Sequence, residues 1–358
     1  MKIALITYHY SNNHGAVMQS YALCRFLREE GHDVEVIDIR QAEGTNLNIF
    51  GRVIKKLLVD YRIRRNQKRY FPPLTKRYMS VDELRANPPE ADCYMVGSDQ
   101  VWNPNISGNL RMAYFLDFGN DKTKRSSYAS SFGLSEWPLK EEKTIQEISA
   151  CLHRFNALSV REKEGQEICK NVFGVNADIV LDPTFLNESY PEFVKRSKQQ
   201  NILVCYKINK TDDFWQYTPQ LANRLGMPVT ILNYNYPKKG YRYCFPPSVN
   251  TWMKKMASAG FILTDSFHGV AFSIINKRQF VAILNHNGRD SRLINLITSL
   301  GLEDRMFDSV GEALKAEPWK KAIDYDTVQP KLDRLREHSI SFLRHALKLN
   351  SLNNEHLS

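Results

Sequence analysis

The stretch FILTDSFHGVAFSIINKRQFVAIL, residues 261–284, decides the fold. An apolar run stops after Thr264, where Asp265, Ser266 and His268 bring in an acid, a hydroxyl and an imidazole, and the apolar pattern then resumes. FILT predicts a buried strand, HGVAFSIIN a helix and QFVAIL a second buried strand. Strands that alternate with helices in this way build parallel sheets. The polar residues therefore fall where a strand ends and a helix begins.

The same alternation opens the chain. KIALITY (2–8) predicts a strand, GAVMQSYALCRFLREEG (15–31) a helix, and HDVEVIDI (32–39) a strand. A new set begins at NILVCYKI (201–208), after a polar stretch at 187–200. We therefore predict an α/β fold class with two Rossmann-like, doubly wound domains. The predicted divisions are residues 1–190, residues 200–327, and a C-terminal helix and tail at 328–358.

Three local expectations accompany this fold. TDDFWQYTPQLANRLGM (211–227) predicts a helix capped by Thr211. NTWMKKMASAG (250–260) predicts a helix capped by Asn250 and ended by a glycine. Residues 41–90 are basic, and their apolar residues follow neither the helical nor the strand period, so the segment is expected to be irregular.

Composition narrows the class of protein. The chain has 358 residues, of which 42% are hydrophobic, so it can bury a large core. Its six cysteines are scattered without CxxC spacing, which argues against a disulfide framework or a zinc site. No apolar run approaches the roughly 20 residues that cross a bilayer, and MKIALITYHY (1–10) resembles a strand more than a signal peptide. We predict a cytoplasmic protein.

Much of the formal net charge of +10 lies in GRVIKKLLVDYRIRRNQKRYF, residues 51–71. One interpretation is a solvated helix face. The other is attraction to an anionic partner, such as a phosphorylated substrate or the inner face of an anionic membrane. No nucleic-acid partner is expected, because no recognised binding motif accompanies the charge.

The junction after residue 264 is the first candidate site. A helix N-terminus presents unpaired N–H groups and a positive dipole end to an anion. Gly269 would allow close approach, and His268 could donate or accept a proton. The alternative for Asp265 and Ser266 is that they only cap the helix.

Three other strand ends are dense in polar groups. In YSNNHGAVMQS (10–20) and VGSDQVWNP (96–104), a capped turn competes with a substrate site, where Asp99 could orient a sugar hydroxyl or act as a base. Arg161 ends SVRE and could bind a carboxylate or phosphate, or merely pair with Glu162 or Glu164. The candidate acceptor-binding residues are Asn13, His14, Gly15, Ser98, Gln100 and Trp102, the last by ring stacking.

Six motifs taken together resemble those of the polysaccharide pyruvyl transferase family, and the resemblance runs from residue 1 to about residue 302. It implies a glycosyltransferase-B-like fold, in which two Rossmann-like domains face a cleft, here with residues 1–190 on the acceptor side and 200–327 on the donor side. The implied activity transfers the enolpyruvyl group of phosphoenolpyruvate to a sugar as a ketal, with no cofactor and no metal. The motifs are NNHGAVMQSYAL (12–23), VGSDQVWN (96–103), SVRE (159–162), LDPTFL (181–186), TDSFHG (264–269) and SRLINLITSLGL (291–302).

The resemblance also implies roles for individual residues. His268 matches the histidine of the family's arginine-x-histidine motif and is the expected acid–base group. Asp99 matches the acid of the first domain. Arg161 matches the arginine after the mid-chain strand and is expected to bind the donor's carboxylate or phosphate. With the residues proposed from their positions in the sequence, the donor-binding candidates are Arg161, Ser266, Phe267, Gly269 and Arg292.

The chain departs from the family pattern at one position. Ser266 stands where many members have an arginine, so one donor-binding cation is missing. Burying the carboxylate and phosphate of phosphoenolpyruvate with too few partners is costly. Either Arg289, Arg292 or Lys207 supplies the charge, or this branch uses another donor.

Three functions therefore remain open. The first is pyruvyl transfer from phosphoenolpyruvate to a sugar or lipid-linked glycan acceptor in the synthesis of an exopolysaccharide or other surface glycan. The second is a glycosyltransferase that uses a nucleotide-sugar donor, because the fold suits it equally. The third is a non-catalytic binding protein of glycan assembly.

Overall fold

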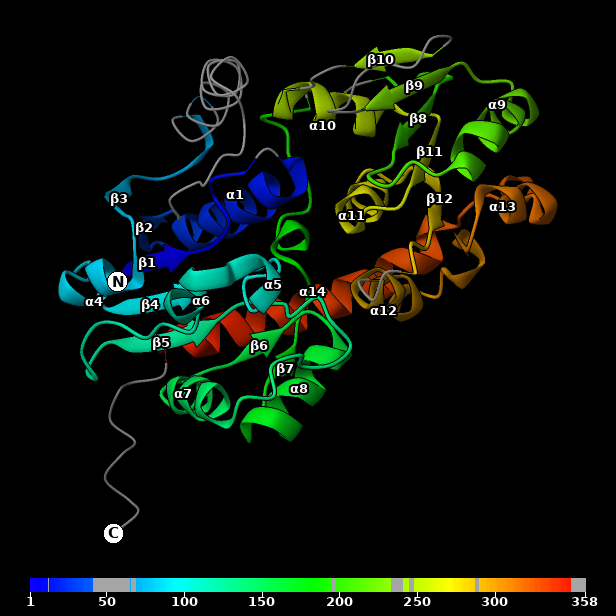
Figure 1. Ribbon diagram of the computed structural model, residues 1–358. Coiled ribbons are helices and arrows are strands. Elements are labelled where there is room, and N and C mark those ends of the chain that lie inside the picture. Colours follow the sequence, from blue (N-terminus) through cyan, green and yellow to red (C-terminus); the bar gives the residue numbers. More distant parts are fainter. Residues whose placement is uncertain are drawn as a thin grey trace, which may run out of the picture. The chain divides into compact units, whose positions relative to one another are not determined.

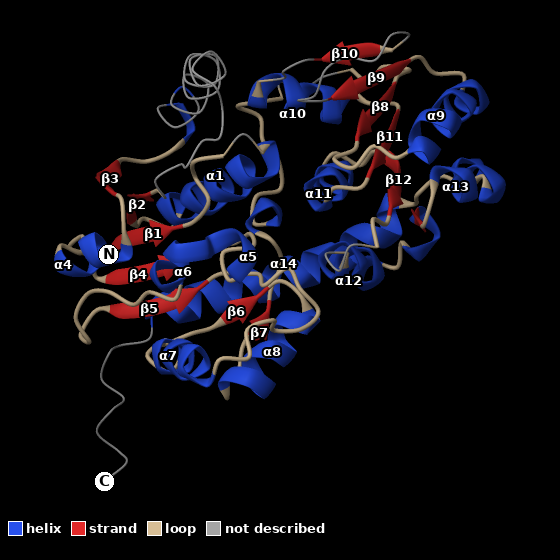
Figure 2. Cartoon of the chain, viewed as in Figure 1, coloured by secondary structure: helices blue, strands red, loops and turns tan. Residues whose placement is uncertain are grey.

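The computed structural model describes residues 1–11, 13–40, 65, 69–194, 198–232, 241–244, 248–286 and 290–348. These residues fall into two compact units of strands and helices (Figure 2). Unit 1 comprises Met1–Leu186 and Leu335–Ser358, and unit 2 comprises Asn187–Arg334. Of the basic segment 51–71, only residues 65 and 69–71 belong to the described residues, so the predicted membrane contact lies largely outside them, as does Arg289.

The described residues of unit 1 form a five-stranded sheet with the order β3-β2-β1-β4-β5, and every strand pair is parallel (Figure 1). A short parallel pair, β6-β7, continues it beyond β5 through single bridges. With β6 counted after β5, the spatial order of the strands is 3-2-1-4-5-6 when each strand is numbered by its place in the chain. This order is the doubly wound arrangement. The strands are β1 (Lys2–Ile6), β2 (Asp33–Ile39), β3 (Leu74–Tyr78), β4 (Cys93–Val96), β5 (Lys124–Ser127), β6 (Ser159–Val160) and β7 (Asp178–Ile179).

Helices bury both faces of this sheet. The central strands are therefore almost continuously apolar, as parallel strands covered on both sides require. One apolar cluster includes Trp102 and Phe132, and the other includes Leu5 and Leu343. In the described part of the chain up to residue 186, the helical segments with defined bounds are α1 (His14–Glu29), α4 (Val81–Ala86), α5 (Pro104–Ser107), η2 (Gly108–Leu110), α6 (Arg111–Tyr114), α7 (Glu142–Leu152), α8 (Lys163–Phe173) and η3 (Pro183–Phe185).

The described residues of unit 2 form a six-stranded, all-parallel sheet with the order β10-β9-β8-β11-β12-β13. Renumbered within the unit, this order is again 3-2-1-4-5-6. Leu263 of the central strand pairs with Cys205 on one side and Val281 on the other. The predicted α/β class with two Rossmann-like units is confirmed. The strands are β8 (Leu203–Tyr206), β9 (Val229–Leu232), β10 (Arg242–Cys244), β11 (Phe261–Thr264), β12 (Gln279–Ile283) and β13 (Met306–Phe307).

Two helix starts in unit 2 test the predicted caps. Thr211 caps α9 as expected, because its hydroxyl accepts a hydrogen bond from Phe214 N. The cap predicted at Asn250 is wrong. Ser248 has the extended backbone of an N-cap and accepts from Thr251 N, so the helix begins earlier. The helical segments are α9 (Asp212–Leu225), α10 (Val249–Ser258), α11 (Phe267–Ile275), α12 (Ser291–Leu300), η4 (Glu303–Arg305), α13 (Val310–Ala316), η5 (Pro318–Lys320) and α14 (Tyr325–Lys348).

Helix α14 crosses the division between the units after Arg334. Its second part is built into unit 1, where the Ser339 hydroxyl accepts a hydrogen bond from Leu181 N and Leu343 is fully buried. These contacts attach residues 335–348 to unit 1, whereas the sequence suggested a separate helix and tail from 328. In the described part of the chain, no helix combines the length and apolar character needed to span a membrane.

Candidate functional site

The switch point of unit 2, where β8 and β11 lie side by side, holds a buried ion pair. The two carboxylate oxygens of Asp265 accept hydrogen bonds from Ile208 N at 2.6 Å and Asn209 N at 2.8 Å. Lys207 Nζ lies 3.2 Å from Asp265 Oδ2, and the side chains of this pair are 2% and 0% exposed. Because the backbone N–H groups share the carboxylate with the ammonium, this buried charge is well satisfied. Asp265 therefore fixes the loop that follows β8.

A second lysine belongs to the same loop. Burial lowers the pKa of the half-buried Lys210; the nearby Asp265 raises it and Lys207 lowers it, and the net shift is downward. Two lysines against one aspartate leave a formal charge of +1 among these three groups. Cations lowered in pKa by burial and like charge gain most from an anionic ligand.

The helix after β11 begins with a tightly packed turn. Ser266 is the N-cap of α11, and its hydroxyl accepts a hydrogen bond from Gly269 N, so the capping interpretation is correct for this residue. Thr264 Oγ1 donates to Tyr206 O at 2.6 Å. A Cβ atom at Gly269 would come within 2.1 Å of Thr264 Oγ1. The close approach that Gly269 permits is therefore that of the helix to its own strand.

His268 lies in the first turn of α11 and is 5% exposed. Its ring meets the edge of the Phe267 ring, with centroids 5.2 Å apart, and Phe267 is partly exposed. Arg292 is the second residue of α12 and is also buried. These four predicted donor-side residues, Ser266, Phe267, His268 and Gly269, stand together at one helix start.

The corresponding region of unit 1 contains a buried guanidinium. Arg161 follows β6, and its Nη1 donates to Asp182 Oδ2 at 2.7 Å and to Ser98 Oγ at 3.3 Å. Its Nη2 donates to Asp99 Oδ1 at 3.1 Å. The Arg161 side chain is 1% exposed, and the Ser98 hydroxyl also donates to Asp182. The structure thus brings together three predicted residues, Ser98, Asp99 and Arg161.

Carboxylates outnumber cations in this cluster. Burial lowers the pKa of Arg161, but Asp182, Asp99 and Glu162 raise it, and the net shift is upward. Glu162 is fully buried and accepts hydrogen bonds from Phe132 N and Gly133 N. Among these four groups, three carboxylates against one guanidinium give a formal charge of −2. The described contacts join Arg161 to Asp99, Asp182 and Ser98. They favour a positioning role, and the predicted donor binding by this residue is not tested by them.

Asp99 has a strained backbone. Its φ of 78° lies in the left-handed region, which non-glycine residues rarely adopt. Gln100 N donates to Asp99 Oδ1 at 2.9 Å, and the Asp99 side chain is 14% exposed. Residues held in such conformations are frequent at functional sites, which supports Asp99 as a candidate.

The predicted role of Trp102 needs correction. The residue is 0% exposed, and its ring stacks on Phe115 and contacts Phe132 in the core. Its indole N–H donates to Tyr114 O at 2.9 Å. The ring has no exposed face for a sugar, and it serves to pack the core of unit 1.

The remaining acceptor-side candidates lie near two strand ends. Asn13 is exposed and caps α1 by accepting from Gly15 N, whereas His14 and Gly15 are buried. Gln100 is partly buried, and its side-chain oxygen accepts from Asn103. Their binding roles stay predictions.

Sequence reasoning missed two members of these clusters, Asp182 and Lys210. Asp182 precedes a proline and also caps η3 by accepting from Thr184 N, so it resembles an ordinary capping residue. Lys210 had a usable signal, since it is the second lysine within four residues after the buried strand NILVCY. Two cations at the carboxyl end of a parallel strand indicate an anion site.

Fold and site together define the class of protein. The chain is a two-unit α/β protein of the Rossmann type, with a cluster of ionised side chains at the carboxyl ends of the strands in each unit, where such proteins bind their ligands. The sequence profile of the polysaccharide pyruvyl transferase family matches residues 13–287, which is more than half of the chain. The chain belongs to this family and is a transferase by that membership. No curated sequence relative matches it.

Several solved structures share this fold over nearly their whole length. The UDP-N-acetylglucosamine 2-epimerase from Rickettsia bellii has 11% identity and a TM-score of 0.53, covering 97% of this chain and 96% of that one. The UDP-GlcNAc 2-epimerase of Methanocaldococcus jannaschii has 12% identity and a TM-score of 0.52, covering 96% and 100%. The Neisseria meningitidis enzyme bound to UDP-GlcNAc has 10% identity and a TM-score of 0.50, covering 98% and 95%. At this identity the likeness shows the fold alone.

Proposed function

We propose that the chain transfers the enolpyruvyl group of phosphoenolpyruvate to a sugar of a surface glycan or exopolysaccharide, as a pyruvate ketal. Membership of the pyruvyl transferase family supports the reaction class. The observation that carries the assignment of donor and acceptor is the difference in charge between the two strand-end clusters. The lysine-rich cluster of unit 2 suits a trianionic donor, whereas the carboxylate-rich cluster of unit 1 suits neutral sugar hydroxyls.

The donor side is built from α11 and the loop after β8. Lys210 would contact the phosphate or carboxylate, and Lys207, which is paired with Asp265, would add its positive charge at longer range. Together they would compensate for the charge missing at Ser266. The N–H groups of the first turn of α11 would add further donors to an anion. His268, in that turn, is the proposed acid that protonates the methylene carbon of the donor.

The chemistry balances without a cofactor. Protonation of the methylene carbon makes C2 electrophilic, and one sugar hydroxyl forms a C–O bond there. A second hydroxyl forms the other ketal bond at C2 while the bond to phosphate breaks. Of the two hydroxyl protons, one replaces the proton that His268 delivered, and the other leaves with the phosphate. Asp99 is the proposed group that orients or deprotonates the sugar hydroxyl.

A nucleotide-sugar donor is the second candidate. The absence of an arginine at position 266 and the fold shared with enzymes solved with UDP-GlcNAc favour it. A diphosphate would meet the same lysines and helix start as phosphoenolpyruvate.

The test compares the two donors directly with the full chain and a panel of sugar acceptors. Phosphate release from phosphoenolpyruvate supports the proposal, and nucleotide release from UDP-sugars supports the second candidate. Glycan binding without turnover of either donor would instead favour a non-catalytic binding protein. The His268→Ala variant should lose phosphate release, and His338→Ala, an exposed histidine of α14, is the matched control.

A further inference from the structure

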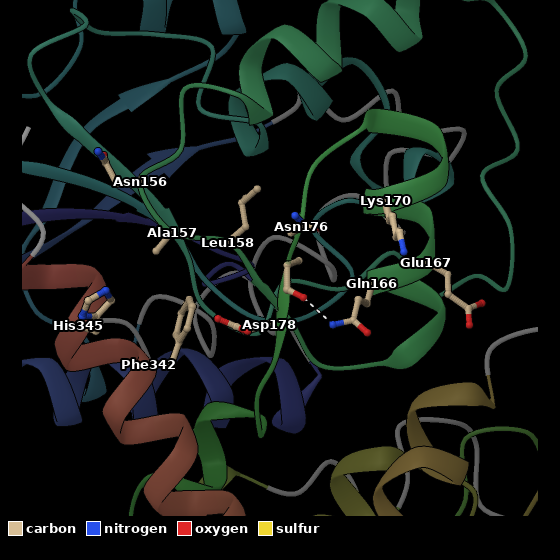
Figure 3. A pocket seen from close by; sticks show the side chains of 11 residues that line it. Asn156, Ala157, Leu158, Gln166, Glu167, Lys170, Asn176, Asp178, Phe342 and His345 are labelled. Carbon is tan, nitrogen blue, oxygen red and sulfur yellow. Dashed lines mark hydrogen bonds between the residues drawn. The ribbon is translucent and has the colours of Figure 1, made fainter. Parts of the chain in front are cut away.

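A separate cavity of about 680 Å³ lies in unit 1 at the amino ends of β6 and β7 (Figure 3). Its walls come from the segments before these two strands, from α8 and from α14. Arg161 and Asp182 follow the carboxyl ends of the same strands, so this cavity is at the opposite edge. The lining residues Asn156, Ala157 and Leu158 come before β6, whereas Arg161 comes after it. We therefore treat the cavity as a site distinct from the carboxyl-end cluster.

Two amide side chains in the cavity have fixed orientations. Asn156 Oδ1 accepts a hydrogen bond from Arg125 N at 2.9 Å, which leaves the Asn156 NH₂ group as a donor. Gln166 Nε2 donates to Ala177 O at 2.7 Å, the dashed contact in Figure 3, which leaves the Gln166 carbonyl as an acceptor. The cavity thus offers a preset donor and a preset acceptor, the combination that a hydroxyl group satisfies.

The charges disfavour an anionic ligand. The carboxylates of Glu167 and Asp178 and the ammonium of Lys170 are exposed at the cavity, and Glu167 also pairs with Lys163 at 3.9 Å. These groups therefore carry no excess of positive charge for an anion. The partly exposed ring of Phe342 supplies an apolar surface beside these polar groups. A volume of this size falls within the roughly 300–1,000 Å³ typical of small-molecule sites.

We propose that this cavity is a second carbohydrate site, which binds a neutral oligosaccharide segment of the glycan away from the reacting sugar. Hydroxyl groups match the fixed amides of Asn156 and Gln166 and the carboxylate of Asp178. The apolar face of a sugar ring matches Phe342. The identity of the natural ligand as the glycan rests on the proposed function, whereas the binding of neutral oligosaccharides does not.

The test uses the methyl signals of the full chain labelled at alanine. Ala157 and Ala177 line the cavity and report on it locally. Maltotetraose, cellotetraose, chitotetraose and mannotetraose are titrated without donor. At least one should shift both signals saturably, and Asp178→Ala should weaken that binding about tenfold, while Glu147→Ala on the exposed face of α7 leaves it unchanged. Gln166→Leu should weaken it similarly, because it removes the preset acceptor.

Three outcomes would overturn the proposal. The first is that none of the four sugars shifts the Ala157 and Ala177 signals. The second is that the shifts are the same in both cavity variants as in wild type. The third is that inorganic phosphate binds the cavity more tightly than any neutral sugar. Failure of pyruvyl transfer is a separate result. Phosphoenolpyruvate affinity, measured by calorimetry, should be the same in Asp178→Ala and wild type, so each idea can fail without the other.

Discussion

The two switch points of this molecule share a topology and differ in charge. Each sheet has the order 3-2-1-4-5-6, and in each an aspartate follows the fourth strand, Asp99 in unit 1 and Asp265 in unit 2. Asp265 takes its cation, Lys207, from the first strand, whereas Asp99 takes Arg161 from beyond the sixth. Additional carboxylates surround Arg161, and an additional lysine lies near Lys207. The fold places ligands at these edges, but the charges decide which ligand each edge suits.

The proposed acid, His268, and the proposed base, Asp99, also differ in burial. His268 is almost covered, at 5% exposed, whereas the Asp99 side chain is more accessible, at 14%, and its backbone is strained. A covered imidazole in a helix's first turn is oriented by its packing. A strained aspartate is held by the network around it. The comparison predicts that substitutions in the two clusters have different effects on turnover, stability and donor affinity.

The largest expected effect is on turnover. His268→Ala should reduce phosphate release from phosphoenolpyruvate by at least about a hundredfold, because general acid catalysis is worth roughly that or more. Circular dichroism should show a folded protein, and His338→Ala should retain wild-type turnover. Wild-type rates in folded His268→Ala would remove the histidine from the reaction and leave the unit 2 site as a binding site only.

The buried ion pairs provide the next contrast. Asp265→Ala leaves Lys207 buried without its carboxylate, and the free energy of unfolding should fall by about 3–5 kcal/mol. Asp265→Asn should cost less, since the amide oxygen still accepts from Ile208 N or Asn209 N. Urea titration monitored by the tryptophans measures both. A loss under about 1 kcal/mol for Asp265→Ala would mean that the pair is more solvated than its burial indicates.

Arg161→Met is the matched change in unit 1. It leaves Asp99 and Asp182 without their shared cation, so a similar loss of stability is expected. It should leave phosphoenolpyruvate affinity unchanged, because Arg161 is already engaged by carboxylates. A large loss of donor affinity in a folded Arg161→Met protein would support the predicted donor binding by Arg161 and contradict the charge contrast between the two clusters.

Packing at the start of α11 gives a smaller effect. The new methyl group of Gly269→Ala would meet Thr264 Oγ1, so the variant should lose about 1–3 kcal/mol of stability by overpacking. Thr264→Ala in the same chain should restore part of it by making room. The double-mutant cycle in urea tests this coupling. Additive losses would show that the helix start relaxes independently of β11.

The smallest expected effect is a shift in pH dependence. Burial holds the pKa of Lys210 below its ordinary value, so the cation is present at low pH and is lost as pH rises through that lowered pKa. Affinity for phosphoenolpyruvate should therefore decline on the alkaline side earlier than an unperturbed lysine would allow. Lys210→Arg should move the decline to higher pH, because guanidinium stays protonated. Identical calorimetric pH profiles for the two proteins would contradict a role for Lys210.

Much of the fold could be predicted from the sequence, because parallel strands buried on both faces are written as short, continuous apolar runs. The failures were β3, LTKRY, and the short helix α4, both inside the segment expected to be irregular. Among the described residues, β3 lies at the edge of the sheet and pairs with β2 alone, so Lys76 and Arg77 are exposed and interrupt the apolar pattern. Edge strands of this kind bury too few side chains to be recognised from the pattern of apolar residues.

The candidate site was only partly predictable. Asp265, Ser266 and His268 are adjacent in the chain, so one junction identified them together. The Arg161 cluster joins residues that are up to 84 positions apart, since Ser98 bonds Asp182, and no local pattern shows such a contact. Trp102 follows two site residues by only a few positions, yet the turn after Asp99 sends its ring into the core.

The most direct test of the charge contrast is calorimetric titration of phosphoenolpyruvate into three proteins: wild type, Lys210→Met and Asp99→Asn. We predict that Lys210→Met weakens binding about tenfold, as loss of a charge-assisted contact should, and that Asp99→Asn stays within about twofold of wild type. Lys254→Met, an exposed lysine of α10, is the control and should bind like wild type. Weakened binding in Asp99→Asn with unchanged binding in Lys210→Met would contradict the assignment of the donor to unit 2.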